Sequence, residues 1–166
     1  MDITGIAKSH HTGIPKASSK KEWKLSDSLR EQIAGYARED AAQNVYMGNK
    51  FLALRKSEVA KVAPDRSALM GKIDMKEIRE ADERWLCILF GEPYEAKFQD
   101  SAIHVYDENG DEILTYTAGV GWHEKESKAE TQVHGALKAA YYDAFRAARQ
   151  EINSGMEVQG GFDARA

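Results

Sequence analysis

Residues 102–152 read AIHVYDENGDEILTYTAGVGWHEKESKAETQVHGALKAAYYDAFRAARQEI. Near the start of this stretch, Asn109-Gly110 separates two runs rich in β-branched and aromatic residues. The dipeptide is typical of a two-residue type I′ hairpin turn, because both central residues of that turn need positive φ. The stretch therefore predicts an antiparallel hairpin over residues 102–117, then a glycine-rich bend, and then one long helix.

The register of the hairpin follows from the turn, because a two-residue turn sets Glu108 opposite Asp111. The expected cross-strand pairs are Tyr106–Ile113, Val105–Leu114, His104–Thr115 and Ile103–Tyr116. One face then carries Ile103, Val105, Leu114 and Tyr116, which we expect to face the core. The other face is mixed and carries Ala102, His104, Tyr106, Ile113, Thr115 and Thr117. Two strands alone are marginal in water, so we expect a third strand or a helix against them.

The region after the hairpin predicts a bend and a helix. Gly119-Val120-Gly121 is expected to bend the chain and place Trp122 against the core. Ser127 and Glu130 have the spacing of a capping box, in which each side chain satisfies a backbone N–H of the first helical turn. We expect the helix to run to about Asn153 and to stop at Gly155. Its apolar face is broad and rich in alanine.

Further helices are expected upstream of the hairpin. Apolar residues recur every three or four positions over residues 28–56, and either Ser26 or Ser28 can cap this helix. Gly48 is unfavourable inside a helix, so two alternatives stay open: one long helix, or two pieces joined at Gly48. Pro64 forces any helix to end before it, and we expect residues 57–65 to be extended. Residues 66–73 are expected to connect this part to the next helix.

Residues 74–90 predict another helix, with a capping-box pair at Asp74 and Glu77 and with stop signals at Gly91 and Pro93. Residues 85–90 form a six-residue apolar run that also fits a buried strand, but the capping signals at both ends favour helix. Cys87 lies inside this run and is expected to be an inert buried thiol. Residues 94–99 alternate as a half-buried strand does.

Composition sets the broad class. The chain has 166 residues, one cysteine and a net charge of −4, which suits a hydrated globular protein without an intrachain disulfide. Residues 1–25 carry +3, which leaves −7 for the rest. This acidity argues against a folded surface that binds the phosphate backbone of nucleic acids. The N-terminal stretch has no apolar segment, so we expect a cytoplasmic protein, and export by a route without a cleaved signal stays open.

These patterns predict an α+β fold in which about three helices pack on a small antiparallel sheet built around the 102–117 hairpin. Residues 1–22 are expected to form a flexible basic arm, residues 23–155 a single domain, and residues 156–166 a flexible tail. No run of about eighteen apolar residues is present, so we expect no membrane-spanning helix and no membrane partner.

The candidate site residues lie around the focal stretch. His104, His123 and His134 fall within it, and Glu124 follows His123, where a carboxylate could orient a general base. No pair of His or Cys residues has a zinc-type spacing, and the acidic hairpin tip lacks the glycine and glutamate positions of a calcium loop. Gly119-Val120-Gly121 lacks the remaining residues of a phosphate loop. We therefore expect neither a metal nor a cofactor.

One further pattern lies on the first helix. Tyr36-x-x-x-Asp40 matches the Tyr-x-x-x-Asp/Glu pattern of some bacterial secretion substrates. With seven tyrosines and 27 acidic residues in the chain, about one such match is expected by chance, so the pattern by itself assigns no function.

No motif assigns a reaction. The leading hypothesis is a non-enzymatic interaction or structural module with a protein partner, which includes a homo-oligomer formed through the alanine-rich helix 127–153. One alternative is a small enzyme with a His/carboxylate site near the Trp122-His123-Glu124 bend. A second alternative is binding of nucleic acid or an acidic partner through the basic N-terminal arm.

Overall fold

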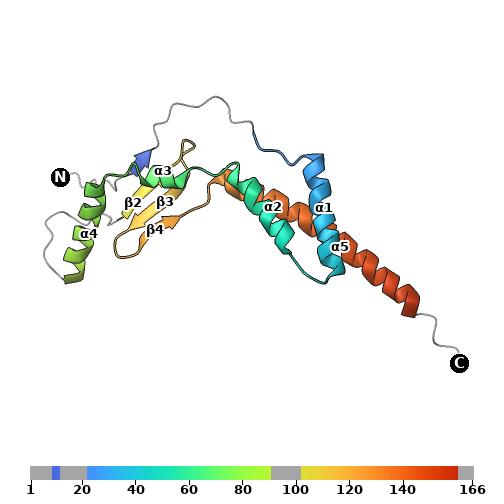
Figure 1. Ribbon diagram of the computed structural model, residues 1–166. Coiled ribbons are helices and arrows are strands. Elements are labelled where there is room, and N and C mark those ends of the chain that lie inside the picture. The colour runs from blue at the N-terminus through green and yellow to red at the C-terminus, as the bar shows by residue number, and fades with distance from the viewer. Residues whose placement is uncertain (1–8, 12–21, 91–101, 161–166) are drawn as a thin grey trace, which may run out of the picture. The chain divides into compact units, whose positions relative to one another are not determined.

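The computed structural model describes residues 9–11, 22–90 and 102–160 of the chain. These residues form five helices and a sheet that contains the predicted antiparallel hairpin, so the α+β class is confirmed (Figure 1). The chain divides into two compact units. One comprises Met1–Lys20 and Ala63–Lys128, and the other comprises Lys21–Val62 and Ala129–Ala166. The single domain expected over residues 23–155 remains a prediction.

The first unit contains a sheet with the strand order β1-β2-β3-β4. Strands β2 (Ala102–Tyr106), β3 (Glu112–Thr117) and β4 (Gly121–Glu124) are antiparallel, and β1 (Ser9–His11) pairs in parallel with β2. The sequence did not predict β1 or β4. Strand β4 supplies the third strand that the hairpin was expected to need. Three predicted pairs are confirmed, Ile103–Tyr116, His104–Thr115 and Val105–Leu114.

The predicted type I′ turn is wrong. The N–H of Asp107 donates to the carbonyl of Asp111 at 2.8 Å, and the N–H of Gly110 donates to the carbonyl of Asp107 at 3.1 Å. Gly110 alone in this loop has positive φ, at 82°, which is the pattern of a three-residue loop with a bulge. The carboxylate of Asp107 selects this loop, because its Oδ1 accepts from the N–H groups of Asn109 and Asp111, both at 2.9 Å.

The longer loop shifts the register at the end of the hairpin. Tyr106 pairs with Glu112 instead of Ile113, and a bulge lies between the Val105 and Tyr106 pairs. Ile113 is the extra residue of the bulge, and it is fully buried with Leu114 in the core cluster. The prediction that Ile113 lies on the mixed face is therefore wrong, because a bulge changes the alternation of side chains along the strand.

Two helices accompany the sheet in this unit, α3 (Arg66–Met70) and α4 (Met75–Phe90). Residues 66–73 were expected to be a connector, but Asp65 accepts from the N–H of Ala68 at 3.0 Å and starts a helix there. The helix over residues 75–90 is confirmed against the strand alternative. The core of the unit joins α3 and the hairpin through Leu69, Ile73, Ile103, Val105, Ile113 and Leu114.

The glycine-rich bend is a turn between β3 and β4. The N–H of Val120 donates to the carbonyl of Thr117 at 3.0 Å, and Gly119 and Gly121 have φ of 78° and 98°. A side chain at Gly119 would meet the ring of Trp85 at 3.0 Å, so α4 packs closely on this turn. The ring of Trp122 packs edge-to-face against the ring of Tyr116, with centroids 5.4 Å apart. Trp122 therefore joins the core as predicted, but from a strand.

The second unit contains α1 (Asp27–Ala42), α2 (Asn49–Ala60) and the long α5 (Lys128–Gly160), and α1 crosses α5 at an angle (Figure 1). Ser26 caps α1 by accepting from the N–H of Leu29 at 3.2 Å. Of the two alternatives left open for residues 28–56, the structure has two helices, and α2 begins directly after Gly48. The core between the three helices is formed by Leu29, Ile33, Ala37, Phe51, Val133, Leu137 and Tyr141.

Two predicted helix ends are wrong. Residues 57–65 were expected to be extended, but α2 continues to Ala60 because Val59 packs on the core and Pro64 is far enough away to permit it. The stop expected at Gly155 does not occur, and α5 continues to Gly160. A glycine inside a helix costs only about 1 kcal/mol, which the helix-forming residues around Gly155 offset.

Several predictions lie outside the described residues. They concern most of the arm 1–22, the stop signals at Gly91 and Pro93, the strand 94–99 and residues 161–166 of the tail. The expectation for the Cys87 thiol is among them, because the structure does not describe this side chain.

Candidate functional site

One face of the sheet aligns two of the predicted site residues. His104 pairs with Thr115, and Thr115 pairs with His123. Residues directly opposite each other in adjacent strands share a face. His104 and His123 therefore lie on the same face with Thr115 between them, and their backbones are two strand spacings apart, about 9–10 Å.

The bulge brings a carboxylate to this face. Glu112 now pairs with Tyr106, which moves its side chain to the side of His104 and Thr115. Its Oε1 lies 2.6 Å from Nδ1 of His104 and accepts a hydrogen bond from the hydroxyl of Thr115. Its Oε2 accepts from Nζ of Lys125 at 2.7 Å. We name these four residues, His104, Glu112, Thr115 and Lys125, the Glu112 cluster.

Glu112 is held as a carboxylate. Partial burial would raise its pKa, but the hydrogen bonds from Lys125, Thr115 and His104 outweigh burial and lower the pKa to about 2. A general base works best when its pKa lies near the working pH. Glu112 is therefore a weak proton acceptor at neutral pH, and both of its oxygens already have partners.

The strand ends around the cluster are fixed by a second set of contacts. The carbonyl of Ile113, inside the bulge, accepts from the N–H of Lys125 at 3.0 Å and from Nε of Arg66 at 3.3 Å. Nη2 of Arg66 also donates to the carbonyl of Lys125 at 2.5 Å. These bonds tie the start of α3 and the end of β4 to the bulge, so they position Lys125 beside Glu112.

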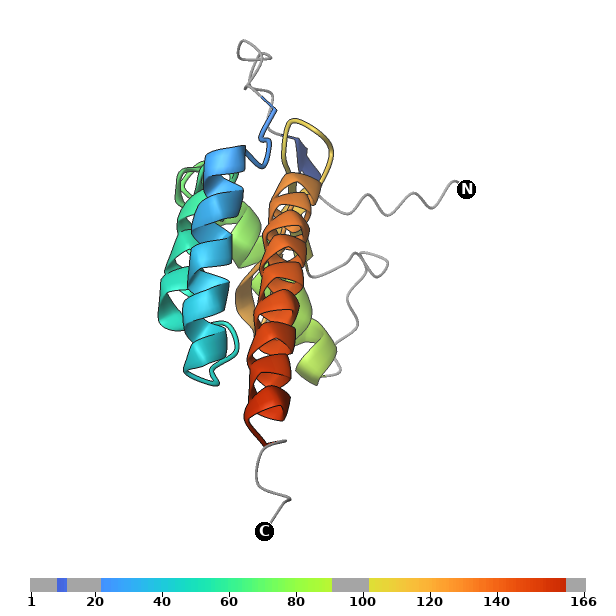
Figure 2. The same cartoon turned by 90° about the vertical axis from the view of Figure 1, so that its right-hand side faces the viewer.

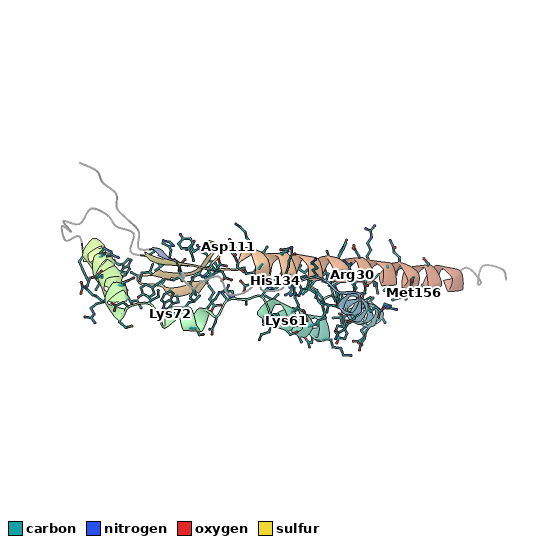
Figure 3. All side chains as sticks on the ribbon, turned by 90° about the horizontal axis from the view of Figure 1, so that it is seen from above. Arg30, Lys61, Lys72, Asp111, His134 and Met156 are labelled. Atoms are coloured by element: carbon teal, nitrogen blue, oxygen red, sulfur yellow. The ribbon has the colours of Figure 1, made fainter. Side chains whose placement is uncertain are left out.

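Asp111 of the hairpin loop, labelled in Figure 3, caps the start of α5. Oδ2 of Asp111 accepts from the N–H of Lys128 at 2.8 Å, and Oδ1 lies 3.2 Å from its Nζ. The bond from the backbone N–H of Lys128 is the main cause of a lowered pKa at Asp111. Negative charge is favourable at the first turn of a helix.

The candidate residues His123 and Glu124 are consecutive residues of β4. Successive residues of a strand point to opposite faces. His123 shares the face of Thr115, whereas Glu124 pairs with Leu114 on the core side, and both side chains are exposed. Glu124 is thus not placed to orient His123.

His134 lies on α5 and belongs to the second compact unit, whereas His104, His123 and Glu124 belong to the first. Figure 3 labels His134 in the early part of this helix. Its side chain is half-buried.

A metal centre has no support in the described residues. Within residues 9–11, 22–90 and 102–160, no three His, Cys, Asp or Glu side chains come together in a group that could hold an ion. The contacts of the Glu112 cluster can stabilise the bulged hairpin, and its geometry by itself defines no reaction.

A second polar contact lies in the helical unit and concerns the Tyr36/Asp40 pattern. Asp40 is 8% exposed, and its Oδ2 accepts from the hydroxyl of Tyr141 at 2.6 Å and from the N–H of Gly48 at 2.9 Å. The hydroxyl of Tyr141 in turn accepts from the N–H of Met47 at 2.8 Å. Asp40 therefore fixes the turn between α1 and α2, which is a structural role.

Sequence reasoning missed Glu112, Lys125 and Asp40 as partners in these contacts. Glu112 and Thr115 are three residues apart, but only the bulge puts them on one face. Asp40 and Tyr141 are separated by 101 residues, so no local signal joins them.

No helix within the described ranges is long and apolar enough to cross a membrane. Comparison with protein-family models, curated proteins and solved structures finds no match to this chain.

Proposed function

We propose that this protein is a non-enzymatic interaction or structural module that binds a protein partner. The observation that carries the proposal is the last turn of α4, where Leu86, Leu89 and Phe90 are 43%, 58% and 72% exposed. Large apolar side chains gathered on a protein surface are typical of interaction sites. We call these three residues the α4 patch.

The arrangement of α4 supports this interpretation. Leu86, Leu89 and Phe90 are spaced at i, i+3 and i+4, so they are neighbours on the helix surface. Another side of α4 packs inside the first unit, because Ala81 is fully buried and Trp85 packs on Gly119. The hydroxyl of Tyr116 also donates to Asp82 at 2.7 Å. The side of α4 that faces the sheet therefore holds the helix in place, and the α4 patch is exposed on its outer side.

Helix α5 offers a second apolar surface, for a homo-oligomer. Its buried positions end at Ala148, which is 7% exposed, and the same stripe continues to Ile152 and to Met156, which is 66% exposed. The helix extends past α1 and α2 at this end (Figure 2). Association through this part of α5 is the form of self-assembly that we propose.

The experiment is a binding series with matched variants. Partners are captured with the full chain, purified, and titrated against wild type, Leu86→Glu, Phe90→Glu and the control Met75→Glu. Met75 is 67% exposed at the other end of α4. We expect Leu86→Glu and Phe90→Glu to weaken binding at least tenfold and the control to bind as wild type does. Equal affinity for all variants would exclude the α4 patch.

Light scattering tests the role of α5 separately. We expect wild type to have a mass above that of the monomer and Met156→Glu to have the mass of the monomer. This result would support association through α5. A monomeric wild type at all concentrations contradicts it.

The enzyme alternative rests on His104 and His123, which share one face of the sheet. Turnover of a small molecule that is lost in a folded His123→Ala variant would favour this alternative and overturn the module. Binding through the basic arm is the remaining alternative, and it predicts a salt-sensitive affinity for nucleic acid that is lost on deletion of residues 1–22.

A further inference from the structure

Arg84 on α4 is a buried charge. Its side chain is 6% exposed, and its Nε atom is shielded from solvent without a hydrogen-bond partner in the described part of the chain. A buried N–H group without an acceptor is unfavourable, and Nε of Arg84 carries such a group. An apolar residue would fill the same place more favourably, so the stability of the unit does not explain an arginine here.

Arg84 lies on the inner side of the helix. It follows Ala81 by three residues, which places the two on the same side, and Ala81 is fully buried. The next residue, Trp85, contacts the turn at Gly119. The stem of Arg84 is therefore held by the packing of α4.

The nearby carboxylates on α4 are directed at other groups. Glu80 is one turn before Arg84, where a helical ion pair could form, but its Oε1 lies 3.8 Å from Nζ of Lys76. Asp82 accepts the hydroxyl of Tyr116 at 2.7 Å.

We propose that Arg84 is the recognition group of a binding site for a small oxyanion, either a phosphate or a carboxylate. The guanidinium is a planar fork of N–H donors that matches the paired oxygens of both groups. An anion bound at Arg84 would neutralise its charge and accept the hydrogen bond from Nε, for which the described residues provide no acceptor. This inference is independent of the proposed function, because it concerns the inner side of α4 and a ligand instead of the α4 patch.

Thermal unfolding of the full chain tests the site with two probes, inorganic phosphate and acetate, each titrated against chloride at equal ionic strength. An anion that binds the folded state raises Tm with concentration. We expect a rise of about 5–10 °C at a hundredfold excess over the dissociation constant for the preferred probe. Response to phosphate alone identifies a phosphate-type ligand, and response to acetate identifies a carboxylate.

Matched variants decide whether Arg84 is responsible. Arg84→Leu is expected to lose the rise and to be at least as stable as wild type without anion, because it removes a buried charge. Arg79→Leu, at an exposed position on the same helix, is expected to respond as wild type does. Arg84→Lys keeps the charge without the fork and is expected to bind about tenfold more weakly by calorimetry. No rise in wild type with either probe, or an equal rise in Arg84→Leu, would overturn the proposal. If Arg84→Leu does not fold, an unchanged affinity in Arg84→Lys would overturn it.

Discussion

The hydroxyl of Tyr141 on α5 lies 2.6 Å from Oδ2 of Asp40 on α1, and both side chains are buried. The same carboxylate oxygen accepts from the N–H of Gly48, and the hydroxyl accepts from the N–H of Met47. One buried contact thus joins two helices to the turn that separates α1 from α2. Asn44 and Met47 in this turn have positive φ, at 56° and 53°, which is unfavourable for residues other than glycine. The hydrogen bonds offset this cost.

Tyr141→Phe is expected to destabilise the protein by about 1–3 kcal/mol. The change leaves the N–H of Met47 without its acceptor and removes one donor from the buried carboxylate of Asp40. Urea unfolding measures the loss, and Tyr142→Phe is the control because Tyr142 is 51% exposed. Equal stability of both variants would contradict a structural role for the contact.

The ionisation of Tyr141 gives a second, independent prediction at alkaline pH. Burial, together with the hydrogen bond to Asp40, raises the pKa of Tyr141 from 10.0 to about 12. A pKa that is raised in the folded state contributes stability that is complete below pH 10 and is lost as the pH rises to about 12. Absorbance titration of tyrosinate should show fewer groups ionising near pH 10 in folded wild type than after unfolding. Tyr141→Phe should reduce this difference without abolishing it, because the hydrogen bond to Asp82 and burial also raise the pKa of Tyr116.

Gly48→Ala should be strongly destabilising although the φ of Gly48 is −62° and permits alanine. A Cβ at this position would lie 2.3 Å from Oδ1 of Asp40, so either the carboxylate or the turn must move. We expect a loss above about 2 kcal/mol.

Gly35→Ala is the matched control, because Gly35 lies inside α1 with no atom within 4 Å of the new Cβ. It should stabilise the protein by about 0.5–1 kcal/mol through helix propensity. Chemical unfolding of both variants separates the clash at Gly48 from a general effect of replacing glycine.

Local patterns in the sequence predicted those parts of the fold that depend on neighbouring residues. The pairs Ile103–Tyr116 and Val105–Leu114 follow from alternation, and the helix start after Ser127 follows from capping chemistry. Local patterns left the break at Gly48 open, because one glycine costs too little to decide it. Strand β4 was missed because its four residues, Gly-Trp-His-Glu, have too little alternation to identify a strand. The end of α5 was missed because glycine alone does not stop a helix.

The candidate site was less predictable, because it depends on which hydrogen bonds form in the hairpin loop. Asn109-Gly110 fits a two-residue turn, but the carboxylate of Asp107 favours the three-residue loop. That choice buries Ile113 and moves Glu112 beside His104. A local competition between two turns therefore decides which residues meet on the mixed face, and the alternation of side chains cannot reveal its outcome.

Substitutions in the loop distinguish the two turns. Gly110→Ala should cost about 1 kcal/mol, because Gly110 has a φ of 82° and the left-handed region is unfavourable for alanine. Asn109→Ala should cost clearly less, because in the observed loop Asn109 does not need positive φ, whereas a type I′ turn would require it. Thermal unfolding compares the two variants, and equal losses would favour the type I′ turn.

Glu112→Gln should remove most of the stabilisation supplied by the Glu112 cluster. The hydrogen bonds from Lys125, Thr115 and His104 outweigh the opposing effect of burial and lower the pKa of Glu112 from 4.5 to about 2. A pKa that is lowered in the folded state contributes stability that is complete above pH 4.5 and is lost as the pH falls to about 2. At pH 7 we expect Glu112→Gln to cost of the order of 1–3 kcal/mol.

The pH dependence identifies the cause of this loss. The difference in unfolding free energy between wild type and Glu112→Gln should shrink as the pH falls from 5 toward 2, because the wild-type carboxylate becomes protonated. Glu108→Gln, at an exposed position of the same loop, should show little loss at any pH. A difference that stays constant down to pH 2 would mean that the loss comes from altered packing and not from the charge of Glu112.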